Sequence, residues 1–227
     1  MQPFSVFIPV YNEEALMVSN TERLIAYLDG LNVPYEVIIG SNGSTDQTCL
    51  LGKAIAFQYN QVKFFHIDRQ APGAAFKQGV AMASYENIIS VDMDLSVDLD
   101  FIPRANTLLA TYDLVIGSKR MSTQRRPFVR QFASSLYIFC CMILLSLSVD
   151  DYSLAAKAYT KKTLKGCLDR LDSGTFYVVQ IVYYASRQNY QAVQIPALCH
   201  DERKSHFNLF YEGVYRFGKL FMLWLAK

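Results

Sequence analysis

Short apolar runs alternate with longer amphipathic segments over the first 118 residues. Runs rich in Val, Ile and Phe are typical of buried strands, and we expect strands at 4–10, 35–40, 62–67, 87–92 and 113–118. The intervening segments have apolar positions at helical spacing and predict helices at 13–31, 45–59, 73–84 and 100–112. Repeated strand and helix units of this kind predict an α/β fold with a parallel, doubly wound sheet.

The pattern changes after residue 118. Residues 131–149 carry no charge and would span about 28 Å as a helix, but the strictly nonpolar centre at 136–145 is short, which favours a buried or interfacial helix over a membrane span. A helix is expected at 176–188, a strand at 191–197 and an amphipathic end at 208–227. No Gly-, Ser- or Pro-rich linker divides the chain, so we expect one domain over 1–227.

The C-terminal segment has one apolar stripe at helical spacing, formed by Phe210, Val214, Phe217, Phe221 and Trp224. The stripe fits two arrangements equally well. It could lie on a membrane surface, or it could pack on the protein's own domain.

Composition narrows the class of protein. The chain has 227 residues, a net charge of +2 and 19% charged residues, which argues against a nucleic-acid partner. Five cysteines without CxxC spacing argue against zinc and favour a reducing compartment. The N-terminus enters a strand without a basic leader, so we expect a cytoplasmic protein.

Two carboxylates follow the fourth apolar run, at Asp92 and Asp94. Alternate residues of a strand face the same way, about 6.6 Å apart, so this pair could converge on one ion. Oxygen ligands without nearby His or Cys suit Mg²⁺ or Mn²⁺. In parallel sheets the strand ends that carry such loops meet at one edge, where ligands bind. For the following Asp98 and Asp100, turn and helix-capping roles are the simpler interpretation.

Five strings resemble family 2 glycosyltransferases in order and spacing: "FIPVYNEE", "SNGSTDQT", "PGAAFKQG", "VDMDLS" and "DLVIGSKR", within residues 4–120. The later chain is similar to the dolichyl- and polyprenyl-phosphate mannose and glucose synthases. The resemblance implies the GT-A fold, with a mostly parallel central sheet flanked by helices and with C-terminal amphipathic helices. It also implies a nucleotide-sugar-binding half over 1–118 and an acceptor-binding half over 119–227 with interfacial helices.

The resemblance implies roles for individual residues. Asp94 would be the principal metal ligand and Asp92 would contact metal or ribose, both in a catalytic role. The nucleotide-sugar site would also include Pro9, Tyr11, Glu13, Asn42, Asp46 and Gly73. The chain departs from the family pattern at Ser41 and Asn42, which replace two carboxylates, at Pro72, which replaces a Lys, and at Gln180, which replaces a Glu.

The implied reaction is a metal-dependent, inverting transfer of mannose or glucose from a UDP- or GDP-hexose to a polyprenyl phosphate. The protein would lie on the cytoplasmic face of a membrane. A lipid phosphate is already anionic, so the reaction needs no general base. Cationic or polar acceptor-binding candidates are Lys119, Arg120, Arg125, Arg126, Arg130, Asp151, Lys157, Arg203, Lys204 and Ser205.

Three alternatives remain open. The basic run after residue 118 could be a solvated loop. The acceptor could be a sugar or glycan hydroxyl, which would require a carboxylate base such as Asp151. The departures at Ser41, Asn42 and Gln180 could instead mark a protein that binds sugar nucleotides without turnover.

Overall fold

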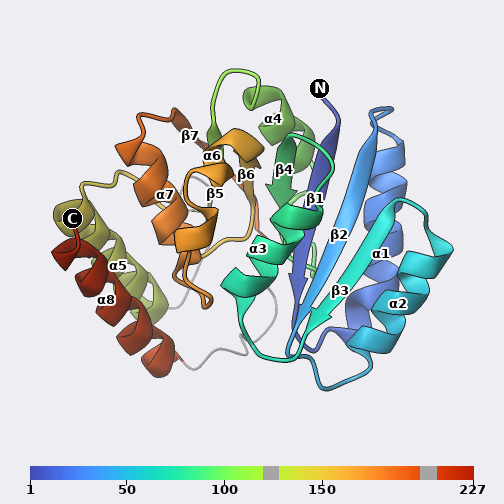
Figure 1. Cartoon of the computed structure of the whole chain (residues 1–227), viewed down its shortest axis with the longest axis horizontal. Helices are drawn as coiled ribbons and strands as arrows, with labels where there is room; N and C mark the ends of the chain where they lie inside the picture. The colour runs from blue at the N-terminus through green and yellow to red at the C-terminus, as the bar shows by residue number, and fades with distance from the viewer. Residues whose placement is uncertain (120–127, 200–208) are drawn as a thin grey trace.

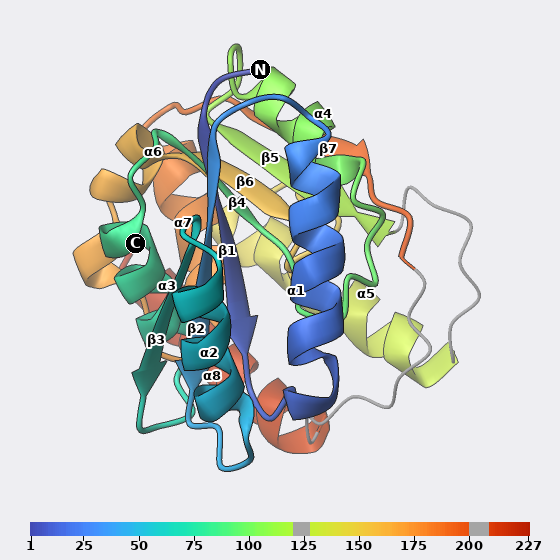
Figure 2. The same ribbon diagram turned by 90° about the vertical axis from the view of Figure 1, so that its right-hand side faces the viewer.

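The computed structural model describes residues 1–119, 128–199 and 209–227. Its described strands form one sheet in the order β3-β2-β1-β4-β6-β5-β7, with helices on both faces (Figures 1 and 2). The strands are β1 (Phe4–Val10), β2 (Tyr35–Asn42), β3 (Val62–Ile67), β4 (Asn87–Ser90), β5 (Leu114–Ser118), β6 (Lys157–Thr160) and β7 (Ala192–Pro196). The helices are α1 (Glu14–Asp29), α2 (Thr48–Gln58), α3 (Pro72–Met82), α4 (Phe101–Leu108), α5 (Phe128–Leu145), α6 (Lys161–Lys165), the short 3₁₀ helix η2 (Leu168–Arg170), α7 (Tyr177–Arg187) and α8 (Leu209–Leu225).

The sheet is mostly parallel, which confirms the predicted fold class. β1 is an interior strand that pairs in parallel with β2 and β4, and β5 pairs in parallel with β7. β6 runs antiparallel to both of its neighbours, β4 and β5. β6 was not predicted from the sequence, because it is four residues long and begins with a lysine that a buried strand rarely contains.

Two apolar layers hold the helices to the sheet. Successive residues of a strand point to opposite faces, so Val37 and Ile39 of β2 enter one core and Ile38 enters the other. The first core packs α1, α2 and α4 against the sheet, and the second packs α3, α5, α7 and α8. Strands from both halves of the chain therefore belong to one continuous sheet.

Two strand ends at the edge where the site was expected differ from the sequence prediction by two residues, whereas β5 and β7 differ from it by only one residue at an end. β2 continues to Asn42, two residues beyond the predicted end. β4 ends at Ser90, so the predicted strand at 87–92 was too long and Asp92 follows the strand instead of lying in it. The Val91 amide donates to the Phe7 carbonyl (3.1 Å), and the chain then turns, with Leu95 at φ +48°.

α5 and α8 lie side by side at the end of the molecule that is farthest from α1 and α2 (Figure 1). α5 begins three residues before the uncharged segment at 131–149 and ends at Leu145. Among the described residues, no helix combines the length and the apolar character needed to cross a membrane.

A buried carboxylate at the start of β2 gives a testable pH dependence. Glu36 accepts hydrogen bonds from the Ser5 hydroxyl (2.6 Å) and the Ser84 amide (2.5 Å), and it pairs with the Lys63 ammonium (2.6 Å). Burial raises the pKa of Glu36, but the bonds from Lys63, Ser5 and Ser84 outweigh it and leave the pKa below its ordinary value. Charged Glu36 therefore stabilises the fold above its unfolded pKa, and this contribution is lost as pH falls through the lower folded pKa.

We expect Glu36→Gln to lower the free energy of unfolding by about 1–3 kcal/mol at neutral pH, because it weakens these charge-assisted bonds. The difference from wild type should shrink in acid, where wild-type Glu36 is also protonated. Urea unfolding of both proteins at about pH 7 and about pH 3 measures the difference. An equal difference at both values would contradict this role for Glu36.

Candidate functional site

The loops that follow β1 and β2 are fastened to each other by hydrogen bonds. Asn12 has a left-handed backbone conformation, with φ +53°. Its backbone amide donates to the Ser44 hydroxyl (3.1 Å), and its side-chain oxygen accepts from the Thr45 backbone amide (2.8 Å). The Glu13 amide donates to the Thr48 hydroxyl (2.8 Å). These contacts hold the predicted nucleotide-binding segments at one edge of the sheet.

Asp46 also joins the loop after β2 to the residues after β1. Its carboxylate accepts hydrogen bonds from the Glu14 amide (3.2 Å) and the Thr48 amide (3.0 Å). Burial raises the pKa of Asp46, but the hydrogen bonds from Thr48 and Glu14 lower it by more. The pKa of Asp46 therefore lies below its ordinary value. The structure thus gives Asp46 a role in fixing the loops, and its expected role in nucleotide binding stays a prediction.

Asn42 and Ser41 end β2, and both are built into the local packing. The buried Asn42 amide donates to the Val10 carbonyl (2.9 Å), which a carboxylate at this position could not do. The Ser41 hydroxyl donates to Ser44 (2.9 Å) and lies 3.0 Å from the His66 ring nitrogen. These contacts give a structural reason for two departures from the family pattern.

The acidic pair lies on the turn after β4. Met93 and Leu95 point into the core, whereas Asp92 and Asp94 remain partly exposed. The turn is held by the Leu95 amide, which donates to the Asp92 carbonyl (3.1 Å), and by the Ser96 amide, which donates to the Asp94 carboxylate (3.0 Å). The two carboxylates are thus presented by a turn, and not by the strand that the sequence analysis expected.

Asp92 lies in a cluster of mixed charge. Burial and the negative charge of Asp94 raise the pKa of Asp92 to about 6, against the opposing effect of Lys119, Lys157 and a hydrogen bond from the Ala155 amide. Burial, the first of these causes, disfavours the charged form of Asp92, and a cation bound beside the pair would favour it.

Lys157 and Asp151 complete the cluster from β6 and the loop before it. Burial lowers the pKa of Lys157 to about 8, partly offset by Asp151 and Asp92. The Lys157 ammonium also donates to the Leu154 carbonyl. Burial raises the pKa of Asp151, but the charges of Lys157 and Lys119 and the hydrogen bonds from Ser153 outweigh it, so its pKa is lowered. The Asp151 carboxylate accepts from the Ser153 amide and hydroxyl, both at 2.8 Å.

The acidic pair fits a hard divalent cation that keeps part of its water shell. Within residues 1–119, 128–199 and 209–227, no three His, Cys, Asp or Glu side chains are grouped to hold a metal ion. Mg²⁺ and Mn²⁺ commonly use one or two carboxylates, with waters and substrate phosphates as the other ligands. Asp92 and Asp94 supply oxygen donors of this type.

The remaining predicted nucleotide-binding residues are placed around this edge. Pro9 lies in β1 opposite Gly40 of β2, and Tyr11 and Glu13 lie in the loop after β1 and are partly buried. The structure thus brings β1 and β2 residues to the same sheet edge as the β4 turn. Their contacts with a nucleotide stay predictions.

Gly73 has a packing role at the start of α3. Its amide donates to the Ser173 carbonyl (2.9 Å), and a Cβ at this position would come within 2.1 Å of the Asp172 carbonyl and 2.7 Å of the Gly174 carbonyl. The nearest atoms are backbone, so the loop at 172–174 would have to move.

We expect Gly73→Ala to destabilise the protein by about 1–3 kcal/mol, since overpacking displaces backbone. Denaturant unfolding measures the loss. Gly218→Ala is the matched control, because a Cβ there has nothing within 4 Å. Equal stability of the two variants would contradict the close approach at Gly73.

Several predicted acceptor residues lie outside the described residues. These are Arg120, Arg125, Arg126, Arg203, Lys204 and Ser205, and the side chain of Arg130 is likewise not described. Of the predicted acceptor set, the structure brings Lys119, Lys157 and Asp151 together beside Asp92.

Two residues that were not predicted from the sequence, Arg216 and Tyr177, interact electrostatically with this cluster. The positive charge of Arg216, in α8, lowers the pKa of Lys157 and of Tyr177. The negative charge of Asp92 acts on Tyr177 in the opposite direction. Arg216 lies outside the apolar stripe of its helix, and no sequence motif links it to the acidic pair. Gln180, which the resemblance placed at the position of an acid, instead accepts from the Asp172 amide (2.5 Å).

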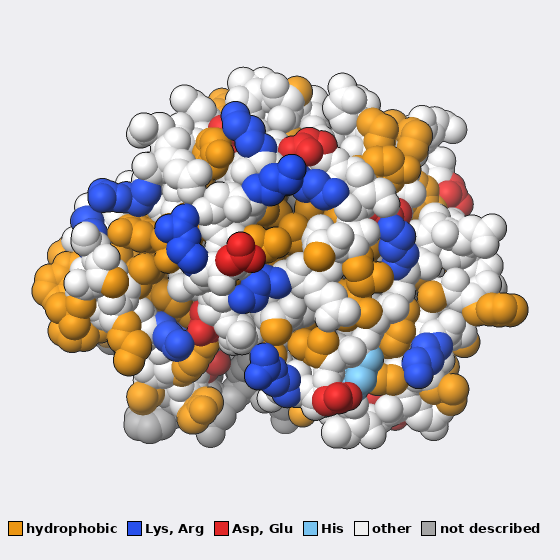
Figure 3. All heavy atoms as spheres, in the orientation of Figure 1, with side chains coloured by type: hydrophobic (Ala, Val, Ile, Leu, Met, Phe, Trp, Pro, Cys, Tyr) orange, Lys and Arg blue, Asp and Glu red, His pale blue; other side chains and the backbone are white. Residues whose placement is uncertain are grey.

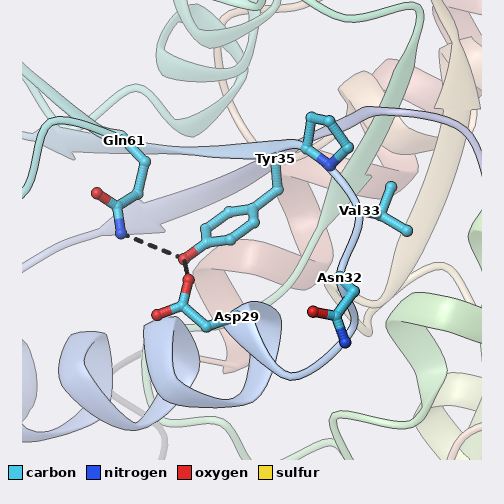
Figure 4. Close-up of a pocket in the computed structure, with 6 residues that line it drawn as sticks. Asp29, Asn32, Val33, Tyr35 and Gln61 are labelled. Atoms are coloured by element: carbon cyan, nitrogen blue, oxygen red, sulfur yellow. Dashed lines mark hydrogen bonds between the residues drawn. The ribbon is translucent and has the colours of Figure 1, made fainter.

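A surface pocket lies at the opposite end of β2 and is separate from this cluster (Figure 4). The Tyr35 hydroxyl donates to Asp29 (2.6 Å) and accepts from Gln61 (3.2 Å), which ties the start of β2 to the end of α1. Burial and the bond to Asp29 raise the pKa of Tyr35 to about 12. Tyr35 begins the strand that Asn42 ends, so about 23 Å of extended chain separates the two places.

Comparison with solved structures identifies the fold. Glucosyl-3-phosphoglycerate synthase from Mycobacterium tuberculosis, crystallised with Mn²⁺ and UDP-glucose, superposes with a TM-score of 0.71 at 18% identity over 98% of this chain and 79% of that chain. The same enzyme in complex with UDP gives a TM-score of 0.69 at 19% identity, over 96% of this chain and 79% of that chain. The protein therefore has the GT-A fold that the sequence resemblance implied.

Comparison with known sequences identifies the family. An undecaprenyl-phosphate 4-deoxy-4-formamido-L-arabinose transferase from Aeromonas hydrophila is 31% identical over 81% of this chain and 56% of its own length. Glycosyltransferase AglD from Haloferax volcanii is 24% identical over 85% of this chain and 32% of its own length. The chain thus spans about half the length, or less, of these relatives. The family model for glycosyl transferase family 2 matches residues 5–153, and the chain belongs to that family.

Proposed function

We propose that this protein transfers a hexose, mannose or glucose, from a UDP- or GDP-hexose to a polyprenyl phosphate, with Mg²⁺ or Mn²⁺ at Asp92 and Asp94. The observation that carries the proposal is the cluster at the sheet edge, where the charges of Asp94, Lys119 and Lys157 all act on Asp92. The acids suit a cation, and the lysines suit the phosphates of a donor or an acceptor.

Asp92 and Asp94 would hold the metal, which when bound would neutralise charge on the departing nucleoside diphosphate. Lys119 orients the anionic acceptor, and the buried Lys157 adds positive charge that attracts it. One phosphate oxygen of the acceptor forms a bond to the anomeric carbon, and the bond from that carbon to the diphosphate breaks with its electron pair leaving on the nucleotide. One displacement inverts the configuration, and no proton has to move.

The environment of Asp151 favours a phosphate acceptor over a hydroxyl. A general base is most effective when its pKa lies near the working pH, and the pKa of Asp151 is held below its ordinary value by Lys157 and Lys119 after burial has raised it. Its carboxylate is already engaged by Ser153. Gln180 cannot act as a base. Asp151 and Gln180 therefore suit a reaction that needs no general base.

The name of the Aeromonas relative supports the acceptor class. The Aeromonas relative is named for transfer to undecaprenyl phosphate, which is a polyprenyl phosphate. Its sugar is a modified arabinose, so the hexose in this proposal rests on the resemblance of the sequence to the mannose and glucose synthases. Because such an acceptor resides in a bilayer, the proposal also places the protein at the cytoplasmic surface of a membrane.

Incubation of the purified chain with UDP- or GDP-hexose, Mn²⁺ or Mg²⁺ and a short-chain polyprenyl phosphate tests this proposal. Mass spectrometry should detect a lipid that has gained one hexose, and omission of the metal should abolish it. A glycan that gains the sugar while the lipid phosphate does not would favour the hydroxyl-acceptor alternative. Metal-dependent nucleotide binding without any product would favour a protein that does not turn over.

A further inference from the structure

A thiol and an imidazole meet beside the end of β2. The Cys49 sulfur lies 3.1 Å from the Nδ1 atom of His66. Cys49 is the second residue of α2, and His66 is the last residue but one of β3. The Asp68 carboxylate lies 3.5 Å from Nε2, the other nitrogen of the ring. This is the arrangement of a nucleophile, a base and a group that orients the base.

Both members of this pair are accessible to solvent. Three of the five cysteines are buried, and the two that are partly exposed are Cys49 and Cys140. His66 is the one histidine among the residues that the structure describes, and its side chain is 27% exposed. Figure 3 shows a histidine at the surface beside an acidic side chain. A small reagent can therefore reach the Cys49 sulfur.

The hydrogen bonds around His66 provide a place for the proton that Cys49 loses when it reacts. The Ser41 hydroxyl donates to Ser44 (2.9 Å), so its oxygen can accept a hydrogen bond from Nδ1 of His66 at 3.0 Å. A proton received by Nδ1 therefore faces the Ser41 oxygen, while a proton on Nε2 faces the Asp68 carboxylate.

We propose that Cys49 is a modification site that forms a mixed disulfide with small-molecule disulfides, with His66 as the proton acceptor. The Cys49 sulfur attacks one sulfur of the disulfide, and the thiol proton passes to Nδ1 of His66. The bond between the two sulfurs of the reagent breaks, and its electron pair leaves with the second sulfur, which takes the proton from the imidazolium. Cys49 is oxidised and half of the reagent is reduced to a thiol, so no further reactant is needed.

An adduct on Cys49 would act on the loops that were predicted to bind the nucleotide. The Ser41 oxygen lies 3.5 Å from the Cys49 sulfur, so a group added to the sulfur adds volume next to Ser41. Ser41 bonds to Ser44, which also accepts from the Asn12 amide in the loop after β1 (3.1 Å). We therefore expect the adduct to weaken binding of the donor nucleotide, and this effect rests on the proposed function.

Labelling with dithiodipyridine, an aromatic disulfide that releases a coloured thione, tests the proposal on the full chain without substrates. After reaction with an equimolar amount, peptide mass spectrometry should find about 10-fold more label on Cys49 than on Cys140. Cys140 is the matched reference, because it is also partly exposed but packs against an apolar core. The comparison uses wild-type protein and does not depend on the folding of a variant.

Three substitutions test the assignment to the pair. Cys49→Ser should remove the fast phase of thione release, and Cys140→Ser should leave it unchanged. His66→Gln should slow the labelling of Cys49 by about 10- to 100-fold, because an amide is polar but cannot take up the proton. Circular dichroism checks that each variant folds. Preferential labelling of Cys140, a fast phase that survives Cys49→Ser, or a wild-type rate in His66→Gln would overturn the inference.

The effect on the donor is measured separately. UDP-hexose and GDP-hexose are titrated into labelled and unlabelled wild-type protein, and the label should weaken nucleotide binding by about 10-fold or more. Removal of the label by dithiothreitol should restore binding. Selective labelling of Cys49 in a protein that binds neither nucleotide would retain the modification site and refute the proposed function. Equal affinity before and after labelling would refute the effect of the adduct on the donor loops.

Discussion

Asp94→Asn is expected to lower the rate of sugar transfer by about 100- to 1,000-fold, since it removes a charged ligand from the proposed metal site. The Asp94 carboxylate accepts a hydrogen bond from the Ser96 amide, and an Asn oxygen can accept the same bond. The turn after β4 should therefore keep its shape. The rate is measured by mass spectrometry of the lipid product at saturating Mn²⁺.

Asp100→Ala is the matched control for this experiment. Asp100 lies in the same acidic segment but is exposed, and its nearest cation is Arg104 at 4.0 Å. This substitution should leave the rate within about twofold of wild type, because exposed ion pairs contribute little. Asp94→Asn with wild-type activity, or an equal loss in both variants, would contradict the assigned role.

Lys157→Met is expected to lower the free energy of unfolding by about 3–5 kcal/mol and to abolish most activity. Lys157 is buried, and its removal would leave Asp151 and Asp92 without their buried cation. Met matches the length of the aliphatic stem without the charge. Denaturant unfolding measures the stability, and the product assay measures the activity.

A second substitution separates the structural role of Lys157 from its functional role. Asp151→Asn removes one of the charges that Lys157 compensates, so the double variant should recover part of the lost stability. It should not recover activity, because the cation that attracts the acceptor phosphate is still missing. Activity that returns together with stability would mean that Lys157 acts only by holding the fold.

The first half of the fold could be predicted because local pattern and tertiary environment agree there. The runs at 4–10 and 62–67 are strands with the predicted bounds, since each is apolar, short and bounded by turn-forming residues. β6 could not be predicted, because a Lys at its first position is compatible with a buried strand only when distant acids compensate it. Those acids, Asp92 and Asp151, are brought to it by the fold.

The site could be predicted only where its residues follow one another in the sequence. Asp92 and Asp94 form a visible pair, but their geometry depends on Ser90 as the last strand residue and on the turn at Leu95. The charge of Arg216 acts on Lys157 from the last helix, and no local pattern connects the two residues. The inward orientation of the Arg216 charge depends on pairing with Glu212 and Thr175, which only the tertiary structure contains.

The central claim is that the acidic pair after β4 binds a divalent cation together with the diphosphate of the donor. A crystal soaked with Mn²⁺ and a sugar nucleotide tests it most directly, by the position of the anomalous scattering peak of manganese. We predict a peak about 2.0–2.2 Å from the nearest Asp94 carboxylate oxygen, with diphosphate oxygens also bound to the metal. A nucleotide bound elsewhere, with no peak beside Asp94 or Asp92, would contradict the account.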